Sequence, residues 1–230
     1  EIKKVLKVCK KFEIDTFDTS SDYGNSEKIL GNLARDNLKI ITKIPKFEEI
    51  GNNVNTFFED LFYKSTENLK TKKIYAVLFR NPTSLLKNIS LWKLAERYKR
   101  NGKIKKIGIT IYDPKELSII YNLLKPDIVQ TPYNFFDRRI ETSGWIEKLF
   151  KDDVEIHCRS IFLQGLLLKK SLPEELSENN DIWKKYQLWL KANNLSALEV
   201  CLNFFSNKKE ISKIIVGIDS ADHLNKIFLT

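Results

Sequence analysis

The feature that most constrains the fold of this chain is a repeated alternation of short apolar runs with segments of helical periodicity. The helical segments carry apolar residues at three- and four-residue steps, as Val54, Phe57, Phe58 and Leu61 do in "VNTFFEDLFYKSTENL". Repeated in this order, strand, helix and strand predict a parallel sheet with helical crossovers. The apolar runs lie at about 14–19, 39–44, 75–80, 104–110, 128–134, 155–163 and 213–218.

The number of apolar runs indicates which parallel fold this is. Seven predicted strands with a helix before the first favour an α/β fold of the (β/α)8 TIM-barrel type that lacks its first strand in this chain. A doubly wound open sheet is the alternative, but it usually carries a glycine-rich phosphate turn, and GxGxxG is absent. No low-complexity linker divides the 230 residues, so we predict one N-terminally incomplete barrel domain over 1–230.

Composition narrows the possible partners. The net charge is +9, but the lysines are spread along the chain beside glutamates, as in "LWKLAERYKR", which is typical of solvated helix faces rather than of a nucleic-acid patch. No apolar run of about 18 residues and no signal peptide is present, which predicts no membrane association and a cytoplasmic protein. Cys9, Cys158 and Cys201 lack CxxC spacing, which suits a reducing compartment and no metal site.

Polar residues at the ends of the predicted strands are the candidates for chemistry, because barrels of this type gather their sites there. Asp18 ends the first apolar run, Tyr23 follows five residues later, and Lys43 lies near the end of the second run. A lysine beside a tyrosine lowers a phenol pKa that starts at about 10, and a carboxylate keeps the lysine charged and in place. Tyr23 can then give a proton to a developing alkoxide.

The same residues allow a structural interpretation. A lysine and an aspartate at strand ends often form an ion pair with no catalytic role, and Tyr23 beside Gly24 can be a turn residue. The spacing alone therefore leaves the function open. His157, which alternates with apolar neighbours in "EIHCRSI", is predicted to pack against the helix layer.

Several segments resemble the aldo-keto reductase family. "FDTSSDYGNSEKILG" is similar to that family's signature, in which a strand-end Asp-Thr is followed by Tyr-Gly and then by a Ser-Glu that opens a helix. "IITKI" resembles the segment that carries the active-site lysine of the family. "VQTPYNFFDRR", "RSIFLQGLLL" and "IIVGIDSADHL" are similar to later strands in the same order, so the resemblance extends over about 1–230.

The resemblance implies an eight-stranded barrel that binds NADPH in extended form and reduces an aldehyde or ketone by hydride transfer. It implies that Tyr23 is the general acid and that Asp18 orients Lys43. The partner is then a small carbonyl substrate, and "RSIFLQG" resembles members that act in carbohydrate pathways, which implies a sugar-derived compound.

The resemblance also implies two groups of cofactor-binding residues. The first group matches positions around the nicotinamide, where Arg159 replaces an aromatic residue that stacks on the ring in many members. The residues of this group are Thr110, Gln130, Asn134, Arg159 and Ser160. The second group matches the loop and helix start that receive the adenosine phosphate. Its residues are Gly217, Asp219, Ser220 and His223.

Three departures from the family pattern leave a second function open. Arg80 stands where the family usually has a catalytic histidine, and its guanidinium can donate to a carbonyl oxygen but adds a cation beside Lys43. Asp219 opposes a bound phosphate while His223 supplies part of a positive charge, so NADH is possible in place of NADPH. The missing first strand leaves two edge strands. The alternative is therefore a catalytically impaired pseudoenzyme barrel that binds a nucleotide or a protein partner.

Overall fold

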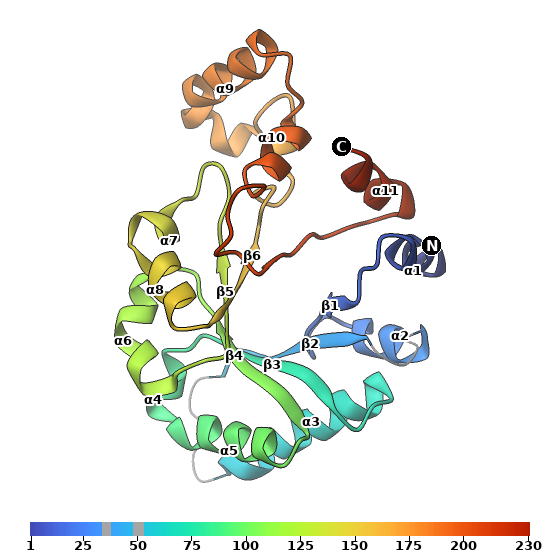
Figure 1. Ribbon diagram of the computed structural model, residues 1–230, viewed down its shortest axis with the longest axis vertical. Helices are drawn as coiled ribbons and strands as arrows, with labels where there is room; N and C mark the ends of the chain where they lie inside the picture. The colour runs from blue at the N-terminus through green and yellow to red at the C-terminus, as the bar shows by residue number, and fades with distance from the viewer. Residues whose placement is uncertain (34–37, 48–52) are drawn as a thin grey trace.

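Seven parallel strands form one sheet in the computed structural model, which describes residues 1–33, 38–47 and 53–230 (Figure 1). All strands lie in the order of the sequence, and each strand pairs with the next. The strands are β1 (Thr16–Asp18), β2 (Lys39–Ile44), β3 (Ile74–Arg80), β4 (Ile104–Thr110), β5 (Ile128–Pro132), β6 (Glu155–Arg159) and β7 (Lys213–Ile214).

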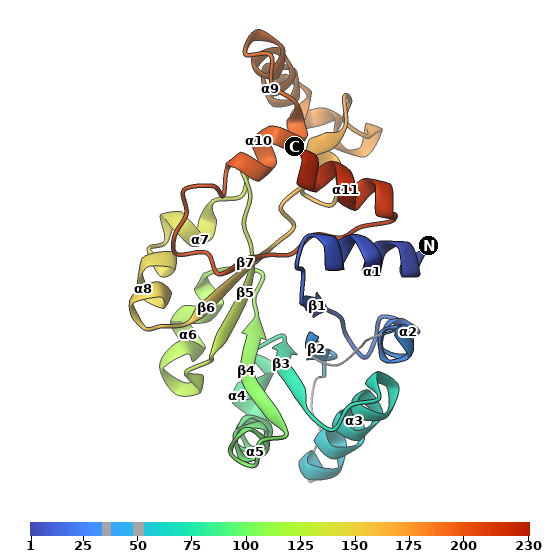
Figure 2. The same ribbon diagram turned by 45° about the vertical axis from the view of Figure 1, so that its right-hand side comes forward.

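Helices connect the strands and cover one face of the sheet (Figures 1 and 2). The helices are α1 (Ile2–Lys11), α2 (Ser26–Leu33), α3 (Val54–Leu69), α4 (Ser84–Lys87), α5 (Ile89–Arg100), α6 (Lys115–Leu124), α7 (Arg139–Thr142), α8 (Trp145–Lys151), α9 (Asn180–Ala192), α10 (Ala197–Asn203) and α11 (Ala221–Leu229). Two 3-10 turns, Leu166–Leu168 and Glu174–Asn179, precede α9. No helix in the described part of the chain is long and apolar enough to cross a membrane.

The strand order distinguishes the two predicted folds. The strand order of a doubly wound sheet reverses at a switch point, whereas these strands follow one another in sequence, as in a barrel that lacks a strand, so the prediction of an open doubly wound sheet is wrong. All seven strands lie within or near their predicted segments. The closed eight-stranded barrel is not formed, because no pairing joins β1 to β7 in the described residues. The sheet is curled and open (Figure 2).

The two faces of the sheet have different cores. The face toward the helices carries the main apolar core, in which Phe58 of α3 packs against Phe79 of β3 and Tyr98 of α5 with ring centroids 6.3 Å and 5.2 Å away. The inner face has a small separate cluster, formed by Ile41, Ala76, Leu78 and Ile128. Since side chains alternate along a strand, polar residues next to this cluster also face inward.

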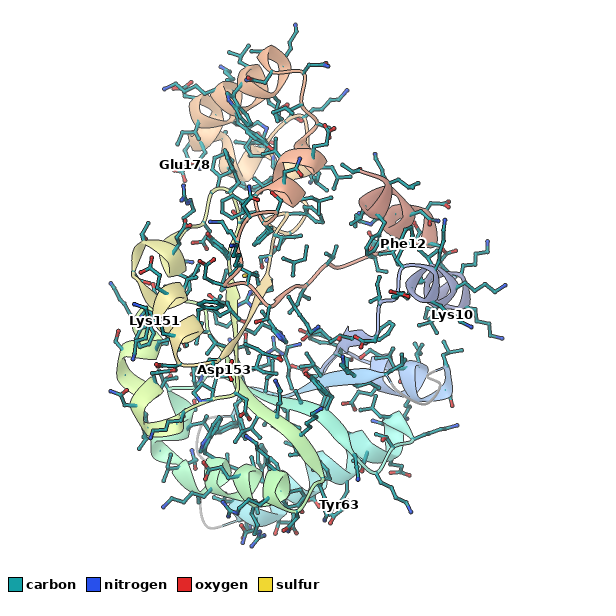
Figure 3. All side chains as sticks on the ribbon, viewed as in Figure 1. Lys10, Phe12, Tyr63, Lys151, Asp153 and Glu178 are labelled. Carbon is teal, nitrogen blue, oxygen red and sulfur yellow. The ribbon has the colours of Figure 1, made fainter. Side chains whose placement is uncertain are left out.

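The first and last helices lie side by side on one edge of the molecule (Figures 1 and 2). Phe12, which follows α1, stacks on Phe228 of α11 with ring centroids 4.3 Å apart. Lys10, two residues earlier, is exposed and points outward (Figure 3). The Glu1 carboxylate accepts a hydrogen bond of 2.9 Å from the backbone N–H of Ala221, the first residue of α11. These contacts join the two ends of the chain.

Candidate active site

A buried ion pair lies at the carboxyl ends of the first two strands. Lys43 of β2 has only 3% of its side chain exposed, and its Nζ donates to the Asp18 carboxylate and to the carbonyl oxygen of Thr19 at 3.0 Å. The second oxygen of Asp18 accepts a hydrogen bond of 2.8 Å from Gln130 Nε2 on β5. The predicted contact between Asp18 and Lys43 is therefore present, and it is part of a polar network on the inner face.

The helix after Tyr23 is fixed to the sheet by a second buried carboxylate. Glu27 of α2 accepts hydrogen bonds from Thr42 Oγ1 at 2.7 Å and from Asn68 Nδ2 at 3.1 Å. Gly31 of α2 lies against the end of α3, where an added Cβ would be 2.1 Å from the backbone oxygen of Asn68. Only glycine allows this approach. The Ser-Glu opening of the helix thus anchors the loop that holds Tyr23.

Tyr23 lies over the ion pair on a tight loop. Its backbone N–H donates to the oxygen of Ser20 at 3.1 Å, and Gly24 after it has a φ of +54°, which favours glycine. Ser21 Oγ donates to the backbone oxygen of Lys43 at 3.2 Å and ties the loop to β2. The Lys43 Nζ is 5.3 Å from the centroid of the Tyr23 ring, which is 46% exposed. The phenol is thus open to solvent on one side and faces a cation on another.

Arg80 at the end of β3 completes this group. Its Nη1 donates to Asp22 Oδ2 at 2.5 Å, and its Cζ is 5.8 Å from the centroid of the Tyr23 ring. Burial alone would lower the pKa of Arg80, but a hydrogen bond with the Tyr112 side chain and the charge of Asp22 outweigh it, so this pKa is raised. Asp22 and Tyr112 are absent from the sequence prediction. Their positions in the sequence could have identified them, because Asp22 directly precedes Tyr23 and Tyr112 follows the fourth strand by two residues.

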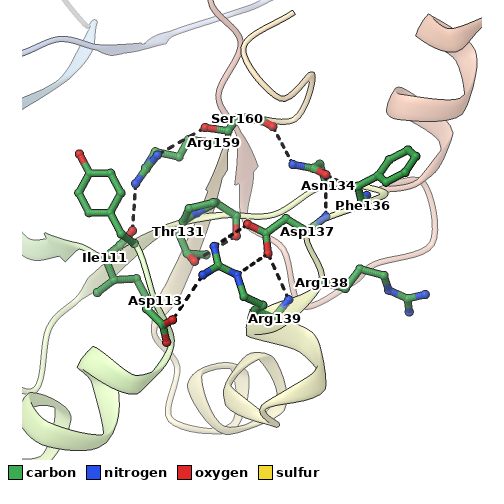
Figure 4. A network of polar contacts seen from close by, with 12 residues as sticks. Ile111, Asp113, Thr131, Asn134, Phe136, Asp137, Arg138, Arg139, Arg159 and Ser160 are labelled. Carbon is green, nitrogen blue, oxygen red and sulfur yellow. Dashed lines mark hydrogen bonds and ion pairs between the residues drawn. The ribbon is translucent and has the colours of Figure 1, made fainter. Parts of the chain in front are cut away.

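Arg159 ends β6, at the same edge of the parallel sheet as Arg80 at the end of β3. Its Cζ is 4.5 Å from the centroid of the Tyr112 ring, and its Nη2 donates to the carbonyl oxygen of Ile111 at 3.0 Å (Figure 4). Its Nη1 is 3.4 Å from Ser160 Oγ. Arg159 therefore reaches from β6 to the end of β4, where it covers one face of Tyr112.

The protonation of Tyr23 differs from the sequence prediction. Burial raises the pKa of Tyr23, Arg80 opposes the rise, and the carboxylates of Asp18 and Asp22 add to it. The predicted lowering of this pKa by Lys43 is wrong in this structure, because the Lys43 ammonium contacts Asp18 and lies beside the ring. Tyr23 therefore keeps its proton at neutral pH.

The pKa of Lys43 is lowered from its ordinary value. Burial lowers the pKa of Lys43, contact with Asp18 raises it, and the charges of Arg80 and Arg159 lower it further. Burial of an ammonium group disfavours its charged form. The Asp18 carboxylate is therefore the main group that keeps Lys43 protonated.

The predicted nicotinamide residues fall into two kinds. Thr110 and Gln130 are buried neighbours in the β4 and β5 register and face the inner side. Asn134 is engaged in the turn after β5, where its Oδ1 accepts from the N–H groups of Phe136 and Asp137 at 2.9 Å and 2.8 Å. Its Nδ2 donates to the oxygen of Ser160 at 3.0 Å (Figure 4). Asn134 therefore holds two loops together.

His157 does not pack against the helix layer, and that prediction is wrong. Ile156 and Cys158 face the helices, so the alternation of β6 directs His157 to the inner face. Its Nε2 is 3.0 Å from Glu155 Oε2, and Glu155 Oε1 binds Lys106 at 2.6 Å. Burial lowers the pKa of His157, while Glu155 opposes this shift. The ring belongs to a charged network of its own.

The predicted adenosine-phosphate residues lie apart from the ion pair. Ser220 caps α11, since its Oγ accepts from the N–H of His223 at 3.1 Å. Gly217 and Asp219 are exposed in the loop before the helix, and the Glu1 carboxylate already accepts from its first residue. No hydrogen bond or ion pair among the described residues connects this group to Lys43 or Tyr23.

Comparisons with known proteins agree with the described geometry. The profile of the Aldo/keto reductase family matches residues 1–229. The aldo-keto reductase AKR11C1 of Bacillus halodurans, in its holo form, has a TM-score of 0.81 and 19% identity, over 99% of this chain and 79% of that chain. PA4992 of Pseudomonas aeruginosa, a protein classed with the aldo-keto reductases, has a TM-score of 0.73 and 18% identity, over 98% of this chain and 81% of that chain. No curated protein sequence gives a match.

Proposed function

Because the chain belongs to the Aldo/keto reductase family, we propose that it reduces an aldehyde or ketone to an alcohol with a nicotinamide cofactor and with Tyr23 as the proton donor. One observation carries this proposal. The exposed phenol of Tyr23 lies beside a buried ion pair of Lys43 and Asp18 at the carboxyl ends of neighbouring strands. Strand ends of this kind are where barrel enzymes place their catalytic groups.

The proposed proton transfer uses Tyr23 as a protonated acid. A bound reduced nicotinamide supplies a hydride to the carbonyl carbon. As negative charge develops on the carbonyl oxygen, the Tyr23 hydroxyl gives its proton to that oxygen, and the product is an alcohol. The phenolate that remains is stabilised by Lys43, 5.3 Å from the ring centroid, and by Arg80, whose Cζ is 5.8 Å away. Asp18 positions Lys43 for this role.

The inner-face residues suit the nicotinamide end of the cofactor better than its phosphate end. Thr110 and Gln130 offer buried polar groups, with Asn134 and Ser160 shaping the loops beside them. Arg159 offers a planar face that can stack on a ring, while the N–H groups at its edge stay available to other ligands. The proposed adenosine-phosphate residues are Gly217, Asp219, Ser220 and His223. There the carboxylates of Glu1 and Asp219 oppose an additional phosphate. We therefore expect NADH to bind at least as tightly as NADPH.

The test is oxidation of NADH and NADPH in the presence of a panel of simple aldehydes, ketones and sugar-derived carbonyl compounds. We expect cofactor oxidation with at least one carbonyl compound. The pseudoenzyme is the second candidate, and the extra cation of Arg80 favours it. Nucleotide binding without oxidation across the panel would support the pseudoenzyme and reject the reductase.

Replacement of Arg80 by glutamine is expected to shift the alkaline limb of the pH profile to higher pH. The Arg80 charge lowers the pKa of both Tyr23 and Lys43. Reduction needs both groups protonated, and protonation is lost as the pH rises, so higher pKa values extend activity upward. The measurement is the pH dependence of kcat/KM for wild type and Arg80→Gln. The control is Arg97→Gln, an exposed arginine on α5, whose limb should match wild type. An alkaline limb at lower or unchanged pH in Arg80→Gln would contradict the proposal that Tyr23 and Lys43 must be protonated for reduction.

A further inference from the structure

Arg159 is a partly buried cation that forms no ion pair among the described residues, although the carboxylates of Asp18 and Asp137 interact with its charge from a distance. Its hydrogen bonds go to the backbone oxygen of Ile111 and, at 3.4 Å, to Ser160 Oγ. In contrast, Arg80 is 2.5 Å from Asp22, and Arg138 is 2.6 Å from Glu141. Burial lowers the pKa of Arg159. A buried charge that lacks an opposite charge costs free energy, so the site is more favourable when an anion enters it.

Positive charge exceeds negative charge around the two exposed phenols. Tyr112 has the Arg159 guanidinium at 4.5 Å and the Lys46 ammonium at 5.5 Å from its ring centroid. Tyr23 has the Lys43 ammonium at 5.3 Å and the Arg80 guanidinium at 5.8 Å from its own centroid. Four cations therefore lie near the phenol rings, and in the described part of the chain two carboxylates form ion pairs with them. These two carboxylates are Asp18 and Asp22.

We propose that Arg159, with Arg80 beside it, binds an anionic group of the carbonyl substrate, either a carboxylate or a phosphate. The proposal rests on the proposed function, because it places the substrate at Tyr23. A guanidinium has five N–H donors in a planar fork, and the hydrogen bonds to Ile111 and Ser160 leave donors for paired contacts with an anion.

The position of the arginines limits the shape of the substrate. The two guanidiniums flank the phenols, and Tyr23 meets the carbonyl oxygen, so the anionic group must lie a few bonds from the reacting carbon. The substrate class is therefore short carbonyl acids or short phosphorylated carbonyl compounds. A phosphate of the cofactor is the other source of an anion. The proposed phosphate residues lie in a separate group at α11, and this favours the substrate as the source.

The experiment compares charged and uncharged substrates of similar size. The pairs are 4-oxobutanoate with butanal and glyceraldehyde 3-phosphate with glyceraldehyde, and kcat/KM is measured for wild type, Arg159→Gln, Arg159→Lys and Arg97→Gln. The ratio of charged to uncharged kcat/KM should fall about 10- to 100-fold in Arg159→Gln for at least one pair, as expected for loss of a charged hydrogen bond. Arg159→Lys should lower this ratio less than Arg159→Gln does, and Arg97→Gln should leave the ratio at the wild-type value. A purely structural role of Arg159 would lower both rates and leave the ratio unchanged, which would overturn the proposal.

Binding measurements separate this proposal from the proposed function. Succinate, inorganic phosphate and NADH are titrated into wild type and Arg159→Gln by calorimetry. We expect the affinity for succinate or phosphate to fall more than the affinity for NADH, and an equal or larger loss for NADH would assign the anion to the cofactor and overturn the proposal. Succinate binding through Arg159 without reduction of any carbonyl would reject the reductase but keep the anion site. If butanal and 4-oxobutanoate are both reduced and Arg159→Gln leaves the ratio of their kcat/KM values unchanged, the reductase is kept and the anion site is rejected.

Discussion

Replacement of Tyr23 by phenylalanine is expected to lower the rate of carbonyl reduction about 100- to 10,000-fold, the usual loss when a general acid is removed. The change deletes the hydroxyl and keeps the ring, so the contacts of the ring with Lys43 and Arg80 can persist. Because burial raises the pKa of Tyr23, the wild-type phenol holds its proton throughout the neutral range. The measurement is the single-turnover rate of cofactor oxidation with saturating carbonyl substrate.

Tyr112 provides a matched control for this variant. Both phenols are 46% exposed, and both lie next to a guanidinium and a lysine, but Lys43 at the Tyr23 ring is buried whereas Lys46 at the Tyr112 ring is exposed. Tyr112→Phe is therefore expected to change the rate less than about tenfold, since no buried ammonium stabilises its phenolate. A larger loss in Tyr112→Phe than in Tyr23→Phe would show that Tyr112 is the acid.

Replacement of Asp18 by asparagine is expected to lower the free energy of unfolding by about 3–5 kcal/mol at neutral pH, as when one partner of a buried ion pair is removed. Lys43 is 3% exposed, and without the carboxylate its ammonium loses its ion-pair partner and keeps only neutral hydrogen-bond acceptors among the described residues. Urea denaturation of wild type and variant measures the difference.

The control for Asp18→Asn is Asp15→Asn, three residues earlier in the chain. Asp15 pairs with Lys39 at 2.6 Å, but both side chains are more than 40% exposed, so the loss should be about 0–1 kcal/mol. The pH dependence adds a second check. Lys43, whose pKa burial lowers, loses its charge as the pH rises, so the destabilisation in Asp18→Asn should shrink at alkaline pH. Equal losses in the two variants would mean that Lys43 is not held as a buried charge.

The sequence predicted the order of strands and the central ion pair because both depend on local patterns. Apolar runs and helical periodicity located the seven strands, and parallel strands bring their ends together, so Asp18 and Lys43 had to be neighbours. The extent of the last strand was less predictable. Only Lys213–Ile214 pairs with β6, although the apolar run continues to residue 218, because pairing depends on the neighbouring strand and not on the run itself.

Other parts of the site depend on contacts that the sequence does not contain. The pKa of Tyr23 rises instead of falling because burial outweighs the neighbouring cations, and burial is a property of the folded chain. The side of the sheet that His157 faces depends on which residues of β6 point inward. Residues on both faces of β6 are buried, so the sequence does not show a clear alternation of polar and apolar residues there. Tyr112 meets Arg159 through a contact between the ends of two strands that are not adjacent.

The contact between α1 and α11 also has a consequence for the order in which parts of the chain fold. Each strand pairs with its successor, so the sheet can grow from one neighbour to the next, whereas the Glu1–Ala221 contact closes a loop of 220 residues. Such long-range contacts form only after the intervening chain has been ordered. We therefore expect α1 and α11 to dock last and to open first, as one cooperative unit. Amide hydrogen exchange should be faster in these two helices than in β3 and β4, and Phe12→Ala should accelerate exchange in both helices at once.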